Sequence, residues 1–129
     1  MNITLTAAFL VLGIMGAGAG LAWQKHSHEH PGEKGTLITG LVVDIACFVS
    51  HASSGPKHAK CAETCARAGN PLAIYDEAAK TLYLPVSVDH KNPNAKLMEF
   101  IEKKVKVSGR VMEKAGLKGI AIEKVEAAP

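Results

Sequence analysis

The sequence predicts a mainly β domain, a five-stranded β-barrel, preceded by a hydrophobic N-terminal helix. Two patterns lead to this prediction. Five short runs place apolar and often β-branched side chains at alternate positions, which is typical of half-buried strands. Every Asp, Glu, Lys and Arg of the 129-residue chain follows Gln24, so the chain divides sharply into an uncharged start and a charged remainder. A chain of this length allows one domain and a short appendage.

Residues 1–23 are predicted to be a signal peptide or a transmembrane anchor. The uncharged run over 3–23 has 21 residues, and as a helix it would extend about 31 Å, roughly the hydrocarbon thickness of a bilayer. Gly20-x-Ala22 would serve as a cleavage site in a signal peptide, whereas Trp23 would lie at the interface in a retained anchor. Both interpretations predict an exported protein, with its domain in the periplasm or on the extracytoplasmic face of the inner membrane.

Residues 24–35 are expected to form a His-rich linker without apolar periodicity. His26, His28 and His30 alternate along it, beside one proline and two glycines. A solvated tether is the simpler interpretation of this composition, and loose metal binding by the three histidines is the alternative.

The first strand is expected over residues 36–46, a β-branched run with alternating apolar positions. Its predicted inward face consists of four apolar residues, Leu37, Leu41, Val43 and Ile45. Gly40 within this run predicts a bulge or a bend.

Turn residues and apolar periodicity predict the remaining elements. A helix is expected from Pro56 to about Ala68, because proline fits a first helical turn and Gly69 would follow the last one. A second helix would begin after Asn92, with an apolar stripe made by Leu97, Phe100 and Ile101. The other expected strands cover residues 72–75, 81–88, 104–112 and 117–125, with a turn at Ala115-Gly116 between the last two.

This order of elements predicts an OB-fold-like barrel. Five short strands with a helix between the third and the fourth are typical of that fold. The closing stretch over 105–126, VKVSGRVMEKAGLKGIAIEKVE, also resembles the last two strands of many small bacterial OB-fold proteins. The domain is therefore predicted over 36–126, with an insertion over 47–69 between the first two strands. A small α+β sheet of another topology is the alternative.

Charge and aromatic content argue against a nucleic-acid partner. The formal net charge is +3 and aromatic residues make up 5% of the chain. Nucleic-acid binding requires clustered basic charge, and base stacking requires aromatic platforms. Alternating Lys and Glu therefore indicate a solvated surface.

The predicted insertion contains all three cysteines and two of the six histidines of the chain. On a helix over 56–68, His58, Cys61 and Cys65 would project within an arc of about 60°. These three are the expected inner metal ligands, and Cys47 and His51 from the preceding segment would complete the set. Thiolate and imidazole ligands favour copper(I) or zinc.

The spacing of the helical cysteines resembles a known copper motif. Cys61-Ala-Glu-Thr-Cys65 is C-x3-C, so it differs from C-x2-C sites, and no histidine follows it as haem c attachment would require. C-x3-C with an outlying histidine is similar to the motif of Sco-type assembly proteins and of the dinuclear copper domain of cytochrome oxidase. The resemblance covers about five residues and implies copper at an extracytoplasmic membrane surface. The third thiol, Cys47, and the expected fold depart from both families.

The sequence leaves two other functions open. In an oxidising compartment two of the three cysteines would pair, which predicts a disulfide-stapled structural or accessory subunit of a membrane complex. Gly13, Gly16 and Gly20 would then offer a helix-packing face. A thiol redox protein is the other alternative. Asp44 and His90 are isolated and are expected to be turn or strand-end groups. We recognise no catalytic constellation, so no enzymatic activity is predicted.

The pattern D-x2-C, H-x2-C-x3-C and G-x-P, behind an apolar N-terminus, resembles a group of small exported bacterial proteins of undefined function. That resemblance implies no mechanism. The function predicted from the residues is a membrane-associated extracytoplasmic module that binds copper or zinc. It would act in metal delivery or in the assembly of a respiratory complex.

Overall fold

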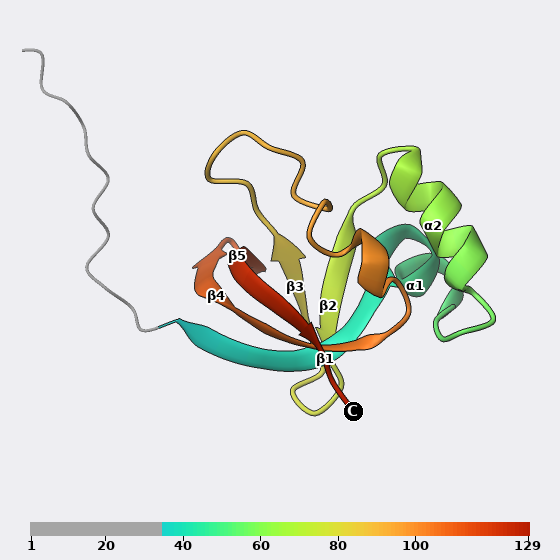
Figure 1. The fold of residues 1–129 in the computed structure, drawn as a ribbon, viewed down its shortest axis with the longest axis horizontal. Helices are drawn as coiled ribbons and strands as arrows, with labels where there is room; N and C mark the ends of the chain where they lie inside the picture. The colour runs from blue at the N-terminus through green and yellow to red at the C-terminus, as the bar shows by residue number, and fades with distance from the viewer. Residues whose placement is uncertain (1–34) are drawn as a thin grey trace, which may run out of the picture.

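The computed structural model describes residues 35–129, which form a closed five-stranded barrel with two helices beside it (Figure 1). The strands are β1 (Thr36–Asp44), β2 (Leu72–Asp76), β3 (Thr81–Pro85), β4 (Lys104–Lys114) and β5 (Leu117–Ala127). Their order around the barrel is β1-β2-β3-β5-β4, and β4 pairs with β1 to close it. Neighbouring strands are antiparallel except β3 and β5, which are parallel. The predicted mainly β class and five-stranded barrel are confirmed.

The predicted N-terminal segment, residues 1–23, lies outside the described residues, as does the His-rich linker up to residue 34. Among residues 35–129, no helix combines the length and the apolar character needed to cross a bilayer.

The inward face of β1 differs from the predicted one. Ile38 and Val42 are buried in the main core, whereas Leu37 is 67% exposed. Val42, Val43 and Asp44 are all fully buried, so both faces of the strand are covered where it ends. Alternation identifies an inward face only when the opposite face meets water. Because both faces are covered at the end of β1, the predicted inward face of this strand is wrong.

Gly40 lies beside the point where β1 pairs with both β4 and β2, and of the predicted bulge or bend the bulge does not form. β1 pairs with β4 through Leu41 and with β2 from Leu41 onward, without a register shift in either pairing. A Cβ atom at position 40 would lie 2.5 Å from the carbonyl oxygen of Tyr75. Glycine is thus required because the β2 backbone approaches β1 closely at this point.

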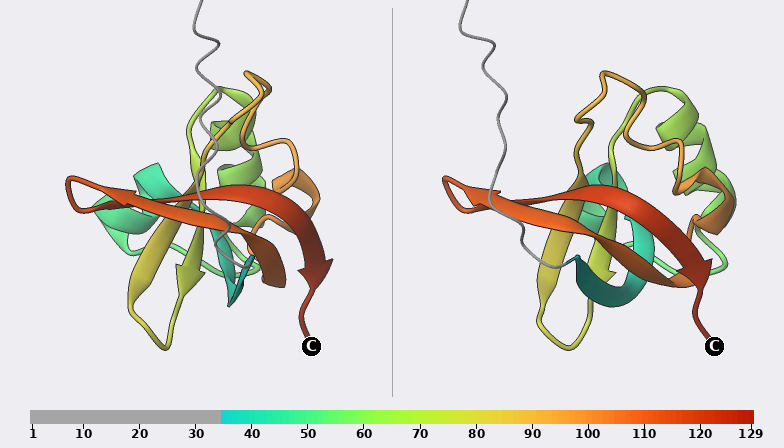
Figure 2. Two further views of the ribbon diagram at one scale, coloured as in Figure 1. Left: turned by 90° about the vertical axis from the view of Figure 1, so that its left-hand side faces the viewer. Right: turned by 60° about the vertical axis from the view of Figure 1, so that its left-hand side comes forward.

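The long hairpin of β4 and β5 supplies much of the barrel wall and extends past it at its turn (Figure 2). Val105 and Val107 face the core as the alternation predicts, and Ile120 meets them there. Both strands run two residues further than expected, to Lys114 and Ala127. The turn at Ala115 and Gly116 is confirmed, and both residues have left-handed φ angles of 52° and 80°.

The segment between β3 and β4 is not the predicted α-helix. It consists of turns and one short 3₁₀ helix, η1 (Met98–Phe100). Of the expected apolar stripe, Leu97 and Ile101 are buried, at 0% and 7% exposure, and Phe100 is partly buried against the core. The Asn94 side chain accepts a hydrogen bond from the Leu72 N–H (3.0 Å) and donates one to the Asn70 carbonyl (2.9 Å). These long-range bonds fix the segment against β2 in a non-helical path.

The insertion between β1 and β2 forms two helices, α1 (Ile45–His51) and α2 (Ala59–Arg67). Helix α1 begins where the predicted first strand was still expected to run, since Asp44 caps the helix by accepting bonds from the N–H groups of Ala46 and Cys47. Helix α2 begins three residues later than predicted, after a turn that starts at Pro56. Gly69 follows it with a φ of 100°, as expected of a helix-ending glycine.

The buried carboxylate of Glu102 ties this insertion to the barrel. It accepts hydrogen bonds from the Gly55 N–H at 2.6 Å and from His58 Nδ1 at 2.9 Å. The backbone N–H of Glu102 donates to the Val42 carbonyl at 2.8 Å, and the Val42 N–H donates to the Lys103 carbonyl at 3.1 Å. The start of α2 and the end of β1 are therefore held by the same short segment.

Replacing Glu102 should destabilise the domain sharply. Glu102→Ala removes the shared acceptor and leaves the half-buried Gly55 N–H and His58 ring unpaired, which costs about 3 kcal/mol of unfolding free energy. Urea unfolding followed by circular dichroism measures this loss. Glu99→Ala is the matched control, because the Glu99 side chain is exposed and should change stability by less than about 0.5 kcal/mol. Equal stabilities for the two variants would contradict the assignment.

Candidate metal centre

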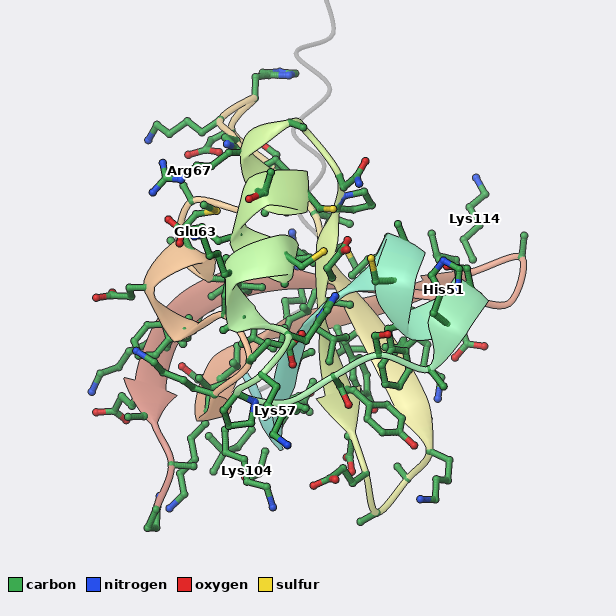
Figure 3. All side chains as sticks on the ribbon, turned by 90° about the vertical axis from the view of Figure 1, so that its right-hand side faces the viewer. His51, Lys57, Glu63, Arg67, Lys104 and Lys114 are labelled. Carbon is green, nitrogen blue, oxygen red and sulfur yellow. The ribbon has the colours of Figure 1, made fainter. Side chains whose placement is uncertain are left out.

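Three cysteine side chains from the two helices of the insertion converge on one point. Cys47 lies in the first turn of α1, and Cys61 and Cys65 lie one turn apart on α2. Their Sγ atoms all lie within 4.8 Å of one another. Sulfur atoms are visible between α1 and α2 in Figure 3. All three thiols are free.

The three thiols differ in how far they reach solvent. Cys61 is exposed, while Cys47 and Cys65 are half-buried. Two small residues of α2, Ala62 and Ala66, are buried in the barrel core, so α2 lies close to the barrel and its cysteines lie near the edge of the core. The cluster therefore lies near the surface, with one sulfur atom facing water.

A buried carboxylate lies behind the two less exposed thiols. Asp44 is fully buried, and its hydrogen bond with the Cys47 thiol, aided by burial and by its negative charge, raises the pKa of Cys47 from 9.0 to about 12. Burial raises the pKa of the Cys65 thiol as well, followed by the charge of Asp44. Both thiols are consequently protonated at neutral pH, and a metal ion would have to displace their protons.

The predicted histidine ligands do not join the cluster of sulfur atoms. His58 is the N-cap residue of α2, and its Nδ1 is bonded to Glu102 at 2.9 Å. His51 is exposed at the end of α1, on the side away from α2 (Figure 3). Among residues 35–129, the group close enough to share an ion consists of Cys47, Cys61 and Cys65.

Two acidic residues of this region were missed or undervalued at the level of sequence. Asp44 was expected to be a strand-end group, and it is one, but it also contacts the thiols. Asp44 is the N-cap residue of α1, and aspartate is a preferred residue at that position. This preference is the sequence signal that could have placed Asp44 beside Cys47. Glu102 carries no comparable signal, because its partners Gly55 and His58 are more than 40 residues away in the sequence.

Three converging thiols can hold a soft metal ion. A tetrahedral zinc site with Zn–S bonds of about 2.3 Å separates its sulfur atoms by about 3.8 Å. The sulfur atoms, which lie within 4.8 Å of one another, would have to approach by about 1 Å at most to reach that spacing. Thiolates select copper(I), zinc and iron–sulfur clusters over hard ions, so the donor set excludes calcium and magnesium as natural occupants.

Comparisons with protein-family models, with curated proteins and with solved structures each give no match for this chain. The function must therefore be argued from the site itself.

The thiols should react with an alkylating agent in a fixed order. Iodoacetamide attacks thiolates, so at pH 8 exposed Cys61 should be labelled first and Cys47, with a pKa of about 12, last. The labelling rate of Cys47 should rise about tenfold per pH unit between pH 8 and 11, because its thiolate fraction does. Peptide mapping by mass spectrometry measures each rate in the reduced protein.

The variant Asp44→Asn provides the control for this order. Asparagine also caps helices, so α1 should persist while the negative charge is lost. The pKa of Cys47 should then fall and its labelling at pH 8 should accelerate. An unchanged rate would show that Asp44 does not hold the proton on this thiol.

Proposed function

We propose that this domain is a metal-binding module for copper or zinc, with Cys47, Cys61 and Cys65 as the protein ligands. The observation that supports it is the approach of all three sulfur atoms to within 4.8 Å of one another. They come from two different helices, so chain proximity alone accounts for only the pair one turn apart on α2. A third sulfur at the same point favours a shared ion over a purely structural arrangement.

Exposure of the site supports a role in metal transfer. A buried structural metal exchanges slowly, whereas a site with the exposed ligand Cys61 is open to an incoming donor from another protein. The barrel gives this site a rigid base, because Asp44, which begins α1, belongs to β1 itself. We propose that the module delivers its ion to a membrane protein complex, such as a respiratory complex under assembly.

The proposed location is the extracytoplasmic face of the membrane. Its support is the uncharged run of 21 residues over 3–23, which suits an anchor or a signal peptide. Thiol pairs oxidise readily in that compartment, and a bound ion would protect these three cysteines. The strand order β1-β2-β3-β5-β4 supports the further proposal that the barrel is an OB-fold.

The same proximity of sulfur atoms supports an alternative function. A disulfide from Cys47 to Cys61 or Cys65 would staple α1 to α2 and leave one thiol free, as in a structural subunit of a membrane complex or a thiol redox protein. Mass spectrometry of protein isolated under non-reducing conditions distinguishes these cases. A stoichiometric disulfide without metal would replace the metal proposal by this one.

Metal analysis of the reduced protein tests the principal proposal. Wild type should retain about one zinc or copper(I) ion per chain after removal of free metal, and each of Cys47→Ser, Cys61→Ser and Cys65→Ser should weaken binding by at least about 10-fold, since each removes a ligand. Affinity should fall as the pH falls, because protons compete for the thiolates. His51→Ala is the matched control and should bind as wild type does. Equal metal content in wild type and in the cysteine variants would end the proposal.

A further inference from the structure

We infer that Asp44 shifts the preference of the three-cysteine site away from copper(I) and toward a divalent thiophilic cation, of which zinc is the biological representative. This inference rests on the proposed metal-binding function and names the class of ion. It assigns to Asp44 the role of a specificity-determining residue that acts through its charge and need not bind the metal directly.

The position of the Asp44 carboxylate is fixed by the fold. The residue is fully buried at the junction of β1 and α1, and its backbone is paired with Leu72 of β2. One carboxylate oxygen accepts from the Ala46 N–H at 3.2 Å, and the other accepts from the Cys47 N–H at 3.4 Å. Because the second of these bonds is to Cys47 itself, in the first turn of α1, the carboxylate lies beside the cluster of sulfur atoms. A charge held in this way cannot turn toward water when a cation binds.

Among residues 35–129, Asp44 forms no ion pair with a basic side chain. Salt in the solvent screens a buried group far less than an exposed one. The negative charge of Asp44 is thus available to a metal ion on the sulfur atoms.

The charge of the loaded site decides between the two kinds of ion. Three thiolates and one carboxylate carry four formal negative charges. Copper(I) would leave three of them uncompensated in a half-buried place, whereas a divalent ion would leave two. Attraction between a fixed charge and a cation is proportional to the charge of the cation, so Asp44 stabilises the divalent ion about twice as strongly.

Competition from protons does not alter this preference. Asp44 also stabilises the protonated thiols, which weakens the apparent affinity for any ion that must displace their protons. Ions bound by the same three thiolates displace the same protons, so for this ligand set the effect cancels in the ratio of the two dissociation constants. The direct attraction to the metal does not cancel, and the ratio therefore reports it.

The test measures zinc and copper(I) dissociation constants for wild type, Asp44→Asn and Asp76→Asn under anaerobic reducing conditions, with chromophoric chelators as competitors. Asp76 is the matched control, because it also ends a strand and accepts two N–H groups, those of Ala78 and Ala79, but belongs to the β2–β3 turn. Asp44→Asn should shift the ratio by at least about 10-fold toward copper(I), the lower end of effects from groups around a metal site. Asp76→Asn should leave the ratio within about twofold of wild type.

Each result decides the inference. An unchanged ratio in Asp44→Asn would overturn it, while the metal-binding proposal would stand on the affinities themselves. Failure of wild type to bind either ion would overturn the proposed function and this inference together. Asp44→Ser, which keeps a helix-capping side chain without the charge, must show the same shift. That variant also gives the result if Asp44→Asn does not fold.

Discussion

The arrangement of the cysteines depends on one buried carboxylate, that of Glu102. It lies in the connection before β4, yet its bonds reach Gly55 and His58 at the start of α2. Its backbone also pairs with Val42 near the end of β1. An unpaired carboxylate in this place would be strongly unfavourable, so the insertion can pack in few ways. Glu102 has a left-handed φ of 57°, which shows that the surrounding contacts determine its conformation.

Asp44 connects the barrel to the chemistry of the site. As the last residue of β1 it is positioned by the sheet, and as the cap of α1 it sets the direction in which Cys47 points. The same carboxylate lies against the thiols and keeps their protons in place. The electrostatic character of the cluster is therefore a consequence of where the barrel ends a strand, and a rearrangement of β1 would alter both geometry and charge.

Solvent exposure increases across the proposed metal centre, from Asp44 to Cys61. Asp44 lies fully inside, Cys47 and Cys65 are half-buried, and Cys61 reaches the surface. Such an order suits an ion that is held firmly from one side and exchanged from the other. The histidines outside this cluster have other surroundings, with His58 in the Glu102 network and His51 in solvent.

The sequence by itself determined the barrel strands, the hairpin turn at Gly116 and the placement of Cys61 and Cys65 on one helix. These features follow from alternation, turn residues and helical spacing, which all act within a few positions of the chain. Only the tertiary structure decided the inward face of β1, the non-helical path of the segment around Leu97, and which residues lie next to Cys47 and His58. These depend on bonds between residues distant in the chain, such as those of Asn94 to Leu72 and of Glu102 to His58. Local patterns contain no record of such partners, and burial of both faces of β1 removed the contrast with water that periodicity requires.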